Sequence, residues 1–200
     1  MKKVEISKIF PALQYFNIPN CLTTIGLIFS IAASVYIAEG NLRAVMILLS
    51  LSASMDLVDG FFAGKLNQQT LFGENLDSLA DFFSCVIMPV GLTIVFLGNS
   101  IWLLGALSFY CICGMWRLAY YNITESDGHY TGLPVPSAML LTSISIWIVV
   151  NYNLPIWLSA LTMVAAGFLM LSFIKLKKYA LWHKVLWAAG AAFVIVVLLS

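Results

Sequence analysis

Four aspartates lie within two neighbouring apolar segments of the chain, where charged side chains are rare. Asp56 and Asp59 are three residues apart, and Asp77 and Asp81 are four residues apart. On an α-helix, these spacings place both members of a pair on one face. An ionised carboxylate inside a membrane costs several kcal/mol, so four of them indicate a function that offsets this cost.

The chemistry that suits such carboxylates is the binding of a divalent cation. The connection between the two segments is short, so an antiparallel hairpin would bring both pairs to one depth near the same surface. Carboxylates held together repel one another, and Mg²⁺ or Mn²⁺ removes the repulsion because both ions prefer oxygen ligands. We therefore predict a site for one or two divalent ions, formed by Asp56, Asp59, Asp77 and Asp81.

Small residues accompany each aspartate pair on the side of the connecting loop. Gly60 and Ala63 follow Asp59, and Gly73 lies one turn before Asp77. Small residues let a ligand or another backbone approach a helix closely. Because protein-bound Mg²⁺ commonly also binds substrate phosphates, this pattern favours a ligand that carries phosphate.

The four aspartates also fit two alternative roles. They would be structural if each paired with a cation inside the bundle, but the membrane segments supply few cations, chiefly Arg117. They would also suit the ion pathway of a channel or an ion-coupled transporter. That alternative leaves the neighbouring glycine and alanine positions without a role.

The composition excludes an ordinary soluble domain. Of the 200 residues, 62% are hydrophobic and only 10% are charged, whereas a soluble domain has about 25% charged residues. The net charge of +1 gives no indication of nucleic-acid binding. Only closed barrels and helices satisfy their backbone groups in lipid, and the long apolar runs favour an all-α transmembrane bundle.

We expect six to eight spans, seven being favoured, because about 20 apolar residues cross a bilayer. Residues 1–17 have apolar side chains at helical spacing over 6–16 and are expected to form an amphipathic helix on the membrane surface. The whole chain, 1–200, is interpreted as one integral membrane domain. The expected spans are 20–38, 42–64, 73–97, 100–122, 134–152, 155–174 and 185–200.

The basic residues predict the orientation, since cytoplasmic loops are enriched in Lys and Arg. With a cytoplasmic N-terminus, nine of the ten Lys and Arg residues lie on or near the cytoplasmic side, and only Arg43 lies outside. The chain is therefore expected in the cell membrane, with the aspartates facing the cytoplasm.

The aspartate segment also has a specific pattern. It reads Asp56-x-x-Asp59-Gly60-x-x-Ala63-Gly64 and, after eight residues, Gly73-x-x-x-Asp77-x-x-x-Asp81. This closely resembles the signature of the CDP-alcohol phosphatidyltransferases, D-x-x-D-G-x-x-A-R-x8-G-x-x-x-D-x-x-x-D. Every fixed position matches except 64, where glycine replaces arginine and Lys65 follows.

Further segments resemble the branch of this family that uses serine, the CDP-diacylglycerol–serine phosphatidyltransferases. Val86 departs from that branch, which has glycine there. The resemblance covers about residues 18–140, which it implies are the catalytic core, with additional membrane helices in 141–200. The similar segments are Ile-Pro-Asn-Cys-Leu-Thr at 18–23, Leu-Asp-Ser-Leu-Ala-Asp at 76–81, Arg-Leu-Ala-Tyr-Tyr-Asn at 117–122 and Gly-Leu-Pro-Val-Pro-Ser-Ala at 132–138.

The resemblance implies that CDP-diacylglycerol and L-serine react to phosphatidylserine and CMP, with Asp81 as the base for the serine hydroxyl. It also implies membrane lipids as surroundings and a homodimer. Arg117 and Asn122 are the candidates for binding the acceptor alcohol. The candidates for binding CDP are Asn20, Thr23, Asp56, Gly60, Ala63, Lys65, Gly73 and Asp77.

Several alternatives accompany these assignments. The acceptor would instead be glycerol 3-phosphate or an inositol phosphate, although these favour more cations facing the aspartates than the chain offers. Arg117 suits a partner of an aspartate or an interfacial anchor equally well. Asn20 and Thr23 suit a helix cap, and Lys65 suits an anchor at the membrane surface. Glycine at position 64 also fits a family member that turns over poorly.

Overall fold

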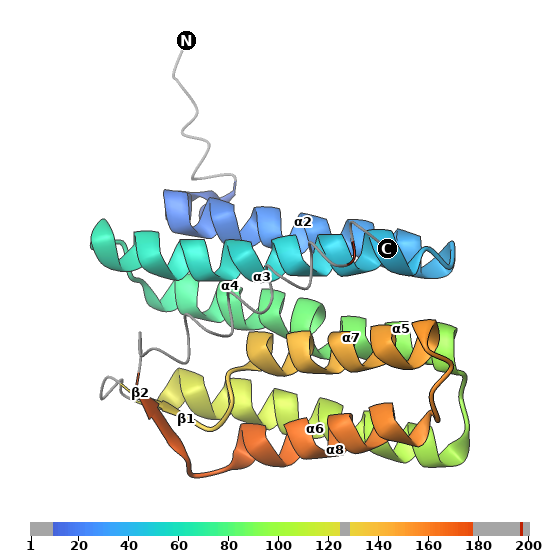
Figure 1. The fold of residues 1–200 in the computed structure, drawn as a ribbon. Coiled ribbons are helices and arrows are strands. Elements are labelled where there is room, and N and C mark those ends of the chain that lie inside the picture. The colour runs from blue at the N-terminus through green and yellow to red at the C-terminus, as the bar shows by residue number, and fades with distance from the viewer. Residues whose placement is uncertain (1–9, 125–128, 178–196, 198–200) are drawn as a thin grey trace.

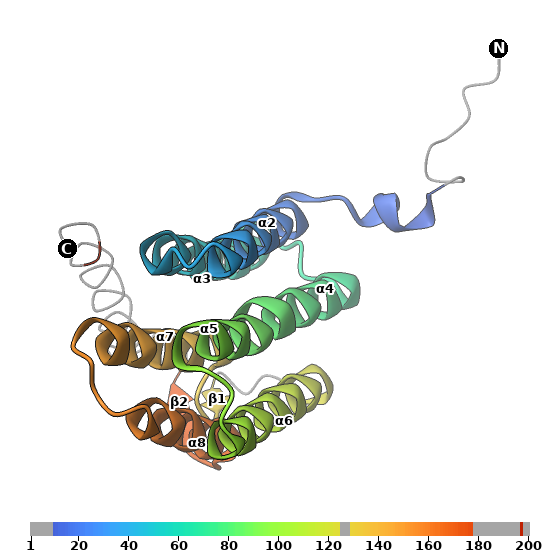
Figure 2. The ribbon, with the colours of Figure 1, turned by 90° about the vertical axis from the view of Figure 1, so that its right-hand side faces the viewer.

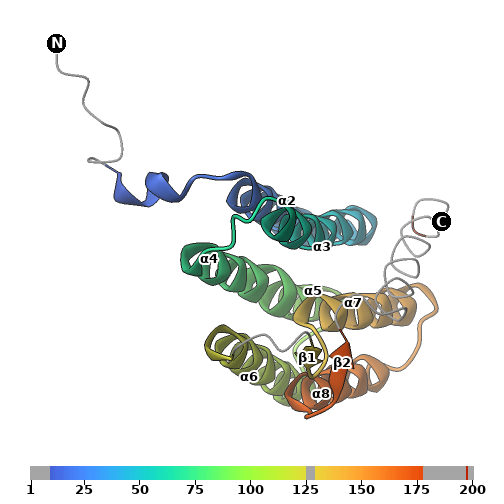
Figure 3. The same ribbon diagram turned by 90° about the vertical axis from the view of Figure 1, so that its left-hand side faces the viewer.

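The described helices stack in three layers. The computed structural model describes residues 10–124, 129–177 and 197. Figures 1, 2 and 3 show α2 and α3 in one outer layer, α4, α5 and α7 in the middle, and α6 and α8 in the other outer layer. The helices are α2 Ile18–Ala38, α3 Leu42–Lys65, α4 Leu71–Asp81, η2 Phe82–Ile87, α5 Met88–Leu97, α6 Ile101–Ile123, α7 Val135–Asn151 and α8 Trp157–Leu171.

Four of the described helical segments are long and apolar enough to cross a membrane: α2, α3, the continuous run Leu71–Leu97 and α6. Their bounds match the first four predicted spans to within two residues. The apolar helices α7 and α8 are shorter, with 17 and 15 residues, than the spans predicted at 134–152 and 155–174. The seventh predicted span, 185–200, lies outside the described residues except for Val197, so the count of seven stays a prediction.

Side-chain caps determine where the first helices begin. The Asn17 side chain accepts a hydrogen bond from the Asn20 N–H at 2.8 Å, at the start of α2. Asn41 does the same for Ala44 in α3, and the Thr70 hydroxyl accepts from the Gly73 N–H at 3.1 Å in α4. Such caps satisfy backbone donors that a helix start leaves unpaired. Asn20 is thus inside α2, and Asn17 is its cap.

The α2–α3 hairpin packs closely because small polar residues line its contact. A Cβ added to Gly26 would lie 3.2 Å from the Cβ of Met55. Deeper in the hairpin, the buried Ser30 hydroxyl donates to the Ser52 hydroxyl at 2.8 Å. Small residues and hydroxyl pairs join helices in lipid, where apolar burial gives little preference for one neighbour over another.

The third span contains a π-helix in its middle. The segment η2 begins directly after Asp81 and leads into α5, so the run is continuous but wider at this point than the regular helix expected over 73–97. Val86 is completely buried in η2 and lies against Gly114 of α6, where an added Cβ would be 2.7 Å from Val86 Cγ2. Glycine at position 114 therefore provides the space that valine at position 86 fills.

Two short strands and a 3₁₀ helix lie at the end of the bundle where α3 ends and α4 begins. Strand β1, His129–Thr131, pairs antiparallel with β2, Lys175–Lys177, and both lie at this end (Figure 1). The 3₁₀ helix η1, Pro11–Tyr15, projects beside the start of α2 (Figure 2). Residues 1–9 of the expected interfacial helix lie outside the described residues, and the all-α fold class is otherwise confirmed.

The contact between Val86 and Gly114 predicts that one substitution lowers stability and that a second one, on the facing helix, compensates for it. Gly114→Ala places a methyl group against Val86 and should lower stability by about 1–3 kcal/mol, as overpacking does. Val86→Ala in the same chain should restore much of this loss by removing the opposing methyl groups. Thermal unfolding in detergent measures both, and equal melting temperatures of the wild type and Gly114→Ala would contradict the contact.

Candidate active site

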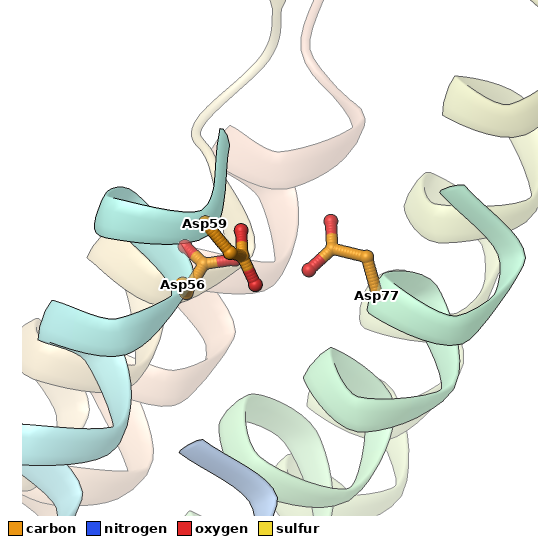
Figure 4. A group of neighbouring side chains, drawn as sticks. All are labelled: Asp56, Asp59 and Asp77. Atoms are coloured by element: carbon orange, nitrogen blue, oxygen red, sulfur yellow. The ribbon is translucent and has the colours of Figure 1, made fainter. Parts of the chain in front are cut away.

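Three of the four aspartates form one cluster. Asp56 and Asp59 on α3 face Asp77 on α4 across the gap between the helices (Figure 4). One carboxylate oxygen from each lies within 4.8 Å of the other two. Asp59 is buried and the other two are partly buried. The predicted approach of the α3 and α4 aspartates is thus found in the structure for three of the four.

Asp81 lies one turn further along α4 and belongs to the wall of the same cavity rather than to this cluster. Its carboxylate accepts a weak hydrogen bond from the Cys85 thiol at 3.5 Å. The cavity has a volume of about 10 Å³, which is about the room that one water molecule requires. It is lined by Thr23, Gly26, Leu27, Ser52, Ala53, Asp56, Asp59, Asp77, Ala80, Asp81, Ser84 and Cys85.

Helix α2 contributes Thr23 to the cluster. The Thr23 hydroxyl donates a hydrogen bond to the Asp59 carboxylate and also lies 3.2 Å from the Pro19 carbonyl. Thr23 is buried, so this donor holds one carboxylate oxygen of Asp59 in place. The predicted cap role does not describe Thr23, because the cap of α2 is Asn17.

Asn20 connects the start of α2 to the start of α4. Its amide donates to the Tyr15 carbonyl at 2.8 Å, and its Oδ1 lies so near Gly73 that a Cβ there would approach it to 2.9 Å. The Tyr15 ring stacks on Phe72 with 4.5 Å between the ring centroids. Glycine at position 73 is therefore required by this close contact, one turn before Asp77.

The two acceptor candidates lie on α6, on the side of α4. Arg117 is buried, donates through Nε to the Leu133 carbonyl at 2.7 Å and interacts electrostatically with Asp56 and Asp81. Asn122 accepts a hydrogen bond from the Ser78 hydroxyl at 2.8 Å. Both residues thus connect α6 to the elements around the cavity, and Arg117 brings positive charge toward the aspartates.

The remaining CDP candidates are divided between the two faces of α3. Ala63 lies on the face of Asp56 and Asp59 by helical spacing, and Gly60 is exposed beside them. Lys65 lies nine residues after Asp56, on the opposite face by helical geometry, and its ammonium is 5.6 Å from the centre of the Phe61 ring. The contribution of Lys65 to CDP binding stays a prediction, and this position favours a role at the membrane surface.

Several cavity residues were not among the sequence candidates, and two of them, Ser84 and Cys85, line the wall next to Asp81. Their spacing from Asp81 could have predicted them, because residues three and four positions later share its face on a regular helix. Ser52 and Ala53 line the cavity from α3 for the same reason, one turn before Asp56.

The three clustered carboxylates fit a divalent metal ion. They are hard oxygen donors from two facing helices, which is the ligand type that Mg²⁺ and Mn²⁺ prefer. Their oxygens are close enough to bind one ion, and the ion would remove the repulsion between them. Asp56, Asp59 and Asp77 would hold it.

Comparison with known proteins identifies the family. The family model described as CDP-alcohol phosphatidyltransferase matches residues 16–188, which includes the four aspartates and both acceptor candidates. A CDP-diacylglycerol–serine O-phosphatidyltransferase from Bacillus subtilis is 34% identical over 177 residues, covering 82% of this chain and 94% of the relative.

Two other relatives show the range of acceptors in these similarities. A CDP-diacylglycerol–serine O-phosphatidyltransferase from Methanocaldococcus jannaschii is 33% identical over 132 residues, covering 66% of this chain and 63% of the relative. A CDP-diacylglycerol–glycerol-3-phosphate 3-phosphatidyltransferase from Aquifex aeolicus is 44% identical over 72 residues, covering 34% and 40%. For the Methanocaldococcus enzyme and two mycobacterial serine enzymes, the chain spans 61–63% of the relative's length.

Two glycines of the site should respond in opposite ways to alanine. Gly73→Ala should lower stability, because its Cβ would come to 2.9 Å from Asn20 Oδ1 and force that side chain to move. Gly60→Ala is the matched control: among the described atoms, none lies within 4 Å of its added Cβ. It should raise stability by up to about 1 kcal/mol through helix propensity. Melting temperatures in detergent test both, and a Gly73→Ala protein as stable as Gly60→Ala would contradict the Asn20 contact.

Proposed function

The chain belongs to the CDP-alcohol phosphatidyltransferase family, and we propose that it transfers the phosphatidyl group of CDP-diacylglycerol to L-serine in phospholipid biosynthesis. The observation that carries this proposal is the carboxylate cluster between α3 and α4, formed by the residues that match the family signature. The names of the bacterial and archaeal relatives support serine as the acceptor. Family membership favours this chemistry over an ion-coupled transporter.

The proposed reaction is an exchange at the phosphorus next to diacylglycerol. The serine hydroxyl oxygen forms a bond to this phosphorus, the bond from phosphorus to the bridging oxygen of CMP breaks, and CMP leaves with the bonding electrons. The serine hydroxyl needs a base, since its pKa is far above neutral, and Asp81 is the candidate. Its place on the cavity wall, apart from the three-carboxylate cluster, supports a base better than a ligand.

The metal ions would be one or two of Mg²⁺ or Mn²⁺, held by Asp56, Asp59 and Asp77. Asp81, which the sequence suggested as a fourth ligand, is proposed as the base instead. When bound, such an ion neutralises charge that develops on phosphate oxygens. Thr23 keeps the Asp59 carboxylate oriented toward the cluster. Reactions of this kind depend mainly on positioning and electrostatics, which these contacts provide.

For CDP binding, we propose the surface formed by the small residues beside the cluster. Gly60 and Ala63 leave little side-chain volume on the cluster side of α3. Gly73 lets Asn20 lie close to the first turn of α4. Lys65 remains a candidate for contact with the diphosphate. This arrangement would let the polar nucleotide lie across the helix ends while the acyl chains of the substrate stay in lipid.

The acceptor is proposed to bind between the aspartates and α6. Arg117 and Asn122 are the candidates, because Arg117 already acts on Asp56 and Asp81 and arginine pairs well with a carboxylate. Glycerol 3-phosphate is the second candidate acceptor, favoured by the 44% identity to the Aquifex enzyme. That match covers a third of the chain, whereas the Bacillus serine enzyme matches over most of it.

We propose that the site faces the cytoplasm of the cell membrane. In Figure 1, the start of α2, the end of α3, the start of α4 and the pair β1–β2 lie at one end of the bundle. Lys65, Lys175 and Lys177 belong to these elements, whereas Arg43 stands at the other end of α3. A cytoplasmic site gives serine and CMP direct access. Seven spans, a surface helix in 1–17, one domain over 1–200 and a homodimer stay predictions.

The substrate assignment predicts the outcome of one assay. Purified protein in detergent, given CDP-diacylglycerol and Mn²⁺ or Mg²⁺, should release CMP when labelled serine is added, with equal incorporation of serine into lipid. Glycerol 3-phosphate and an inositol phosphate serve as the alternative acceptors. CMP release with glycerol 3-phosphate alone would overturn the serine assignment, and release with none of the three would overturn the proposed activity.

The separate position of Asp81 predicts that turnover and metal binding respond differently. Asp81→Asn should lower kcat by roughly 10²–10⁴-fold, the usual contribution of a general base. Its Mn²⁺ affinity, measured by electron paramagnetic resonance, should stay close to that of the wild type. Asp77→Asn is the matched control and should lose both. Equal loss of Mn²⁺ binding in the two variants would show that Asp81 is a ligand of the ion.

A further inference from the structure

The cavity wall beyond Asp81 has an unusual backbone. The π-helix η2, Phe82–Ile87, begins at the residue after Asp81, and its residues Ser84 and Cys85 line the cavity. The N–H of Met88 donates to the Phe83 carbonyl, five residues earlier, as is characteristic of a π-helix. Such turns widen a helix and change the direction of the side chains around them.

The sequence supplies a cause for this widening. Pro89 lies four residues after Cys85, so the regular helical donor for the Cys85 carbonyl would be the N–H that proline lacks. The proline ring would also collide with that carbonyl in a regular α-helix. A π turn relieves the collision, and a further donor to the Cys85 carbonyl is favourable because unsatisfied carbonyl groups within a membrane are costly.

Tyr110 of α6 provides that donor. Its hydroxyl donates to the Cys85 carbonyl at 2.8 Å, and its side chain is completely buried. Gly114, one turn later on α6, lies against Val86, and Arg117, almost one further turn along, acts on Asp81. One face of α6 therefore contacts η2 through Tyr110 and Gly114, and its Arg117 interacts electrostatically with Asp81.

We propose that Tyr110 is a positioning residue, whose hydroxyl holds the Cys85 carbonyl in the π turn and thereby fixes Asp81 relative to the cluster of Asp56, Asp59 and Asp77. Tyr110 acts through the backbone of η2 and the Cys85 thiol, which itself donates to Asp81. The catalytic part of this proposal rests on the proposed function; the structural part does not.

The test compares Tyr110→Phe with Tyr120→Phe, which removes a phenol hydroxyl from an exposed position of the same helix. In the serine assay, Tyr110→Phe should lower kcat by roughly 10- to 100-fold, the effect of a small misplacement of a catalytic group. The KM for CDP-diacylglycerol and the Mn²⁺ affinity should change by less than about twofold, because the three clustered carboxylates are untouched. Tyr120→Phe should behave as wild type.

Hydrogen exchange gives a readout that does not depend on activity. In Tyr110→Phe, amides in 82–90 should exchange about tenfold faster, since a buried carbonyl loses its donor, while amides in α2 keep their rates. Adding Pro89→Ala to Tyr110→Phe supplies a backbone N–H to the Cys85 carbonyl and should restore slow exchange in 82–90. This rescue separates satisfaction of the carbonyl from simple packing of the ring.

The outcomes are distinguishable. Unchanged exchange in 82–90, or no rescue by Pro89→Ala, would overturn the role of the Tyr110 hydroxyl in the π turn. Faster exchange with kcat equal to wild type would overturn its role in positioning Asp81, as would an equal loss of Mn²⁺ affinity and kcat. A wild type that releases no CMP would instead overturn the proposed function and leave the exchange result to decide the structural part.

Discussion

The apposition of Asp56 and Asp59 with Asp77 is the constraint on which the rest of the site depends. Like charges within 4.8 Å repel strongly in a poorly polarisable environment, so neighbouring elements must compensate. Helix α2 contributes a hydroxyl donor from Thr23, and α6 contributes the positive charge of Arg117. Helix α3 packs beside α2, and α4 lies between this layer and α6. A divalent cation at the cluster would complete the compensation.

Contacts at one end of the bundle hold the helices around Asp77 in place. The cap of α4 at Thr70, the contact of Asn20 with Gly73 and the stacking of Tyr15 on Phe72 all lie within two turns of Asp77. These contacts fix the open end of the cavity. The deep end is fixed differently, by a proline that widens the helix and a phenol hydroxyl that donates to the carbonyl left without its helical donor. Asp77 is therefore held by contacts at the start of α4 and Asp81 by the contact between η2 and Tyr110, although both aspartates lie on one face of α4.

Helical spacing predicted the fold class, the first four spans and the approach of the two aspartate pairs, because these depend on hydropathy and on a short connection. It could not separate Asp81 from the cluster, since a shared face does not specify how closely the opposite helix approaches each residue on it. The partner of Thr23 lies 36 residues away on another helix, a contact that only packing decides. Hydropathy also misplaced the end of α8: Phe173 and Ile174 are apolar, but the chain there leads into β2, which hydropathy cannot distinguish from a helix.

The departure from the family signature at position 64 and the departure from its serine-using branch at position 86 have different physical consequences. Val86 replaces glycine at a buried position, and its added volume is taken up by Gly114 on the facing helix, so the contact between η2 and α6 remains close. Gly64 is exposed, and its neighbour Lys65 extends over Phe61 on the face away from Asp56. The first change is an exchange of volume between two helices that keeps the wall beyond Asp81 intact. The second lies at the exposed end of α3 beside the proposed CDP surface, so we expect it to affect substrate binding rather than the carboxylate cluster.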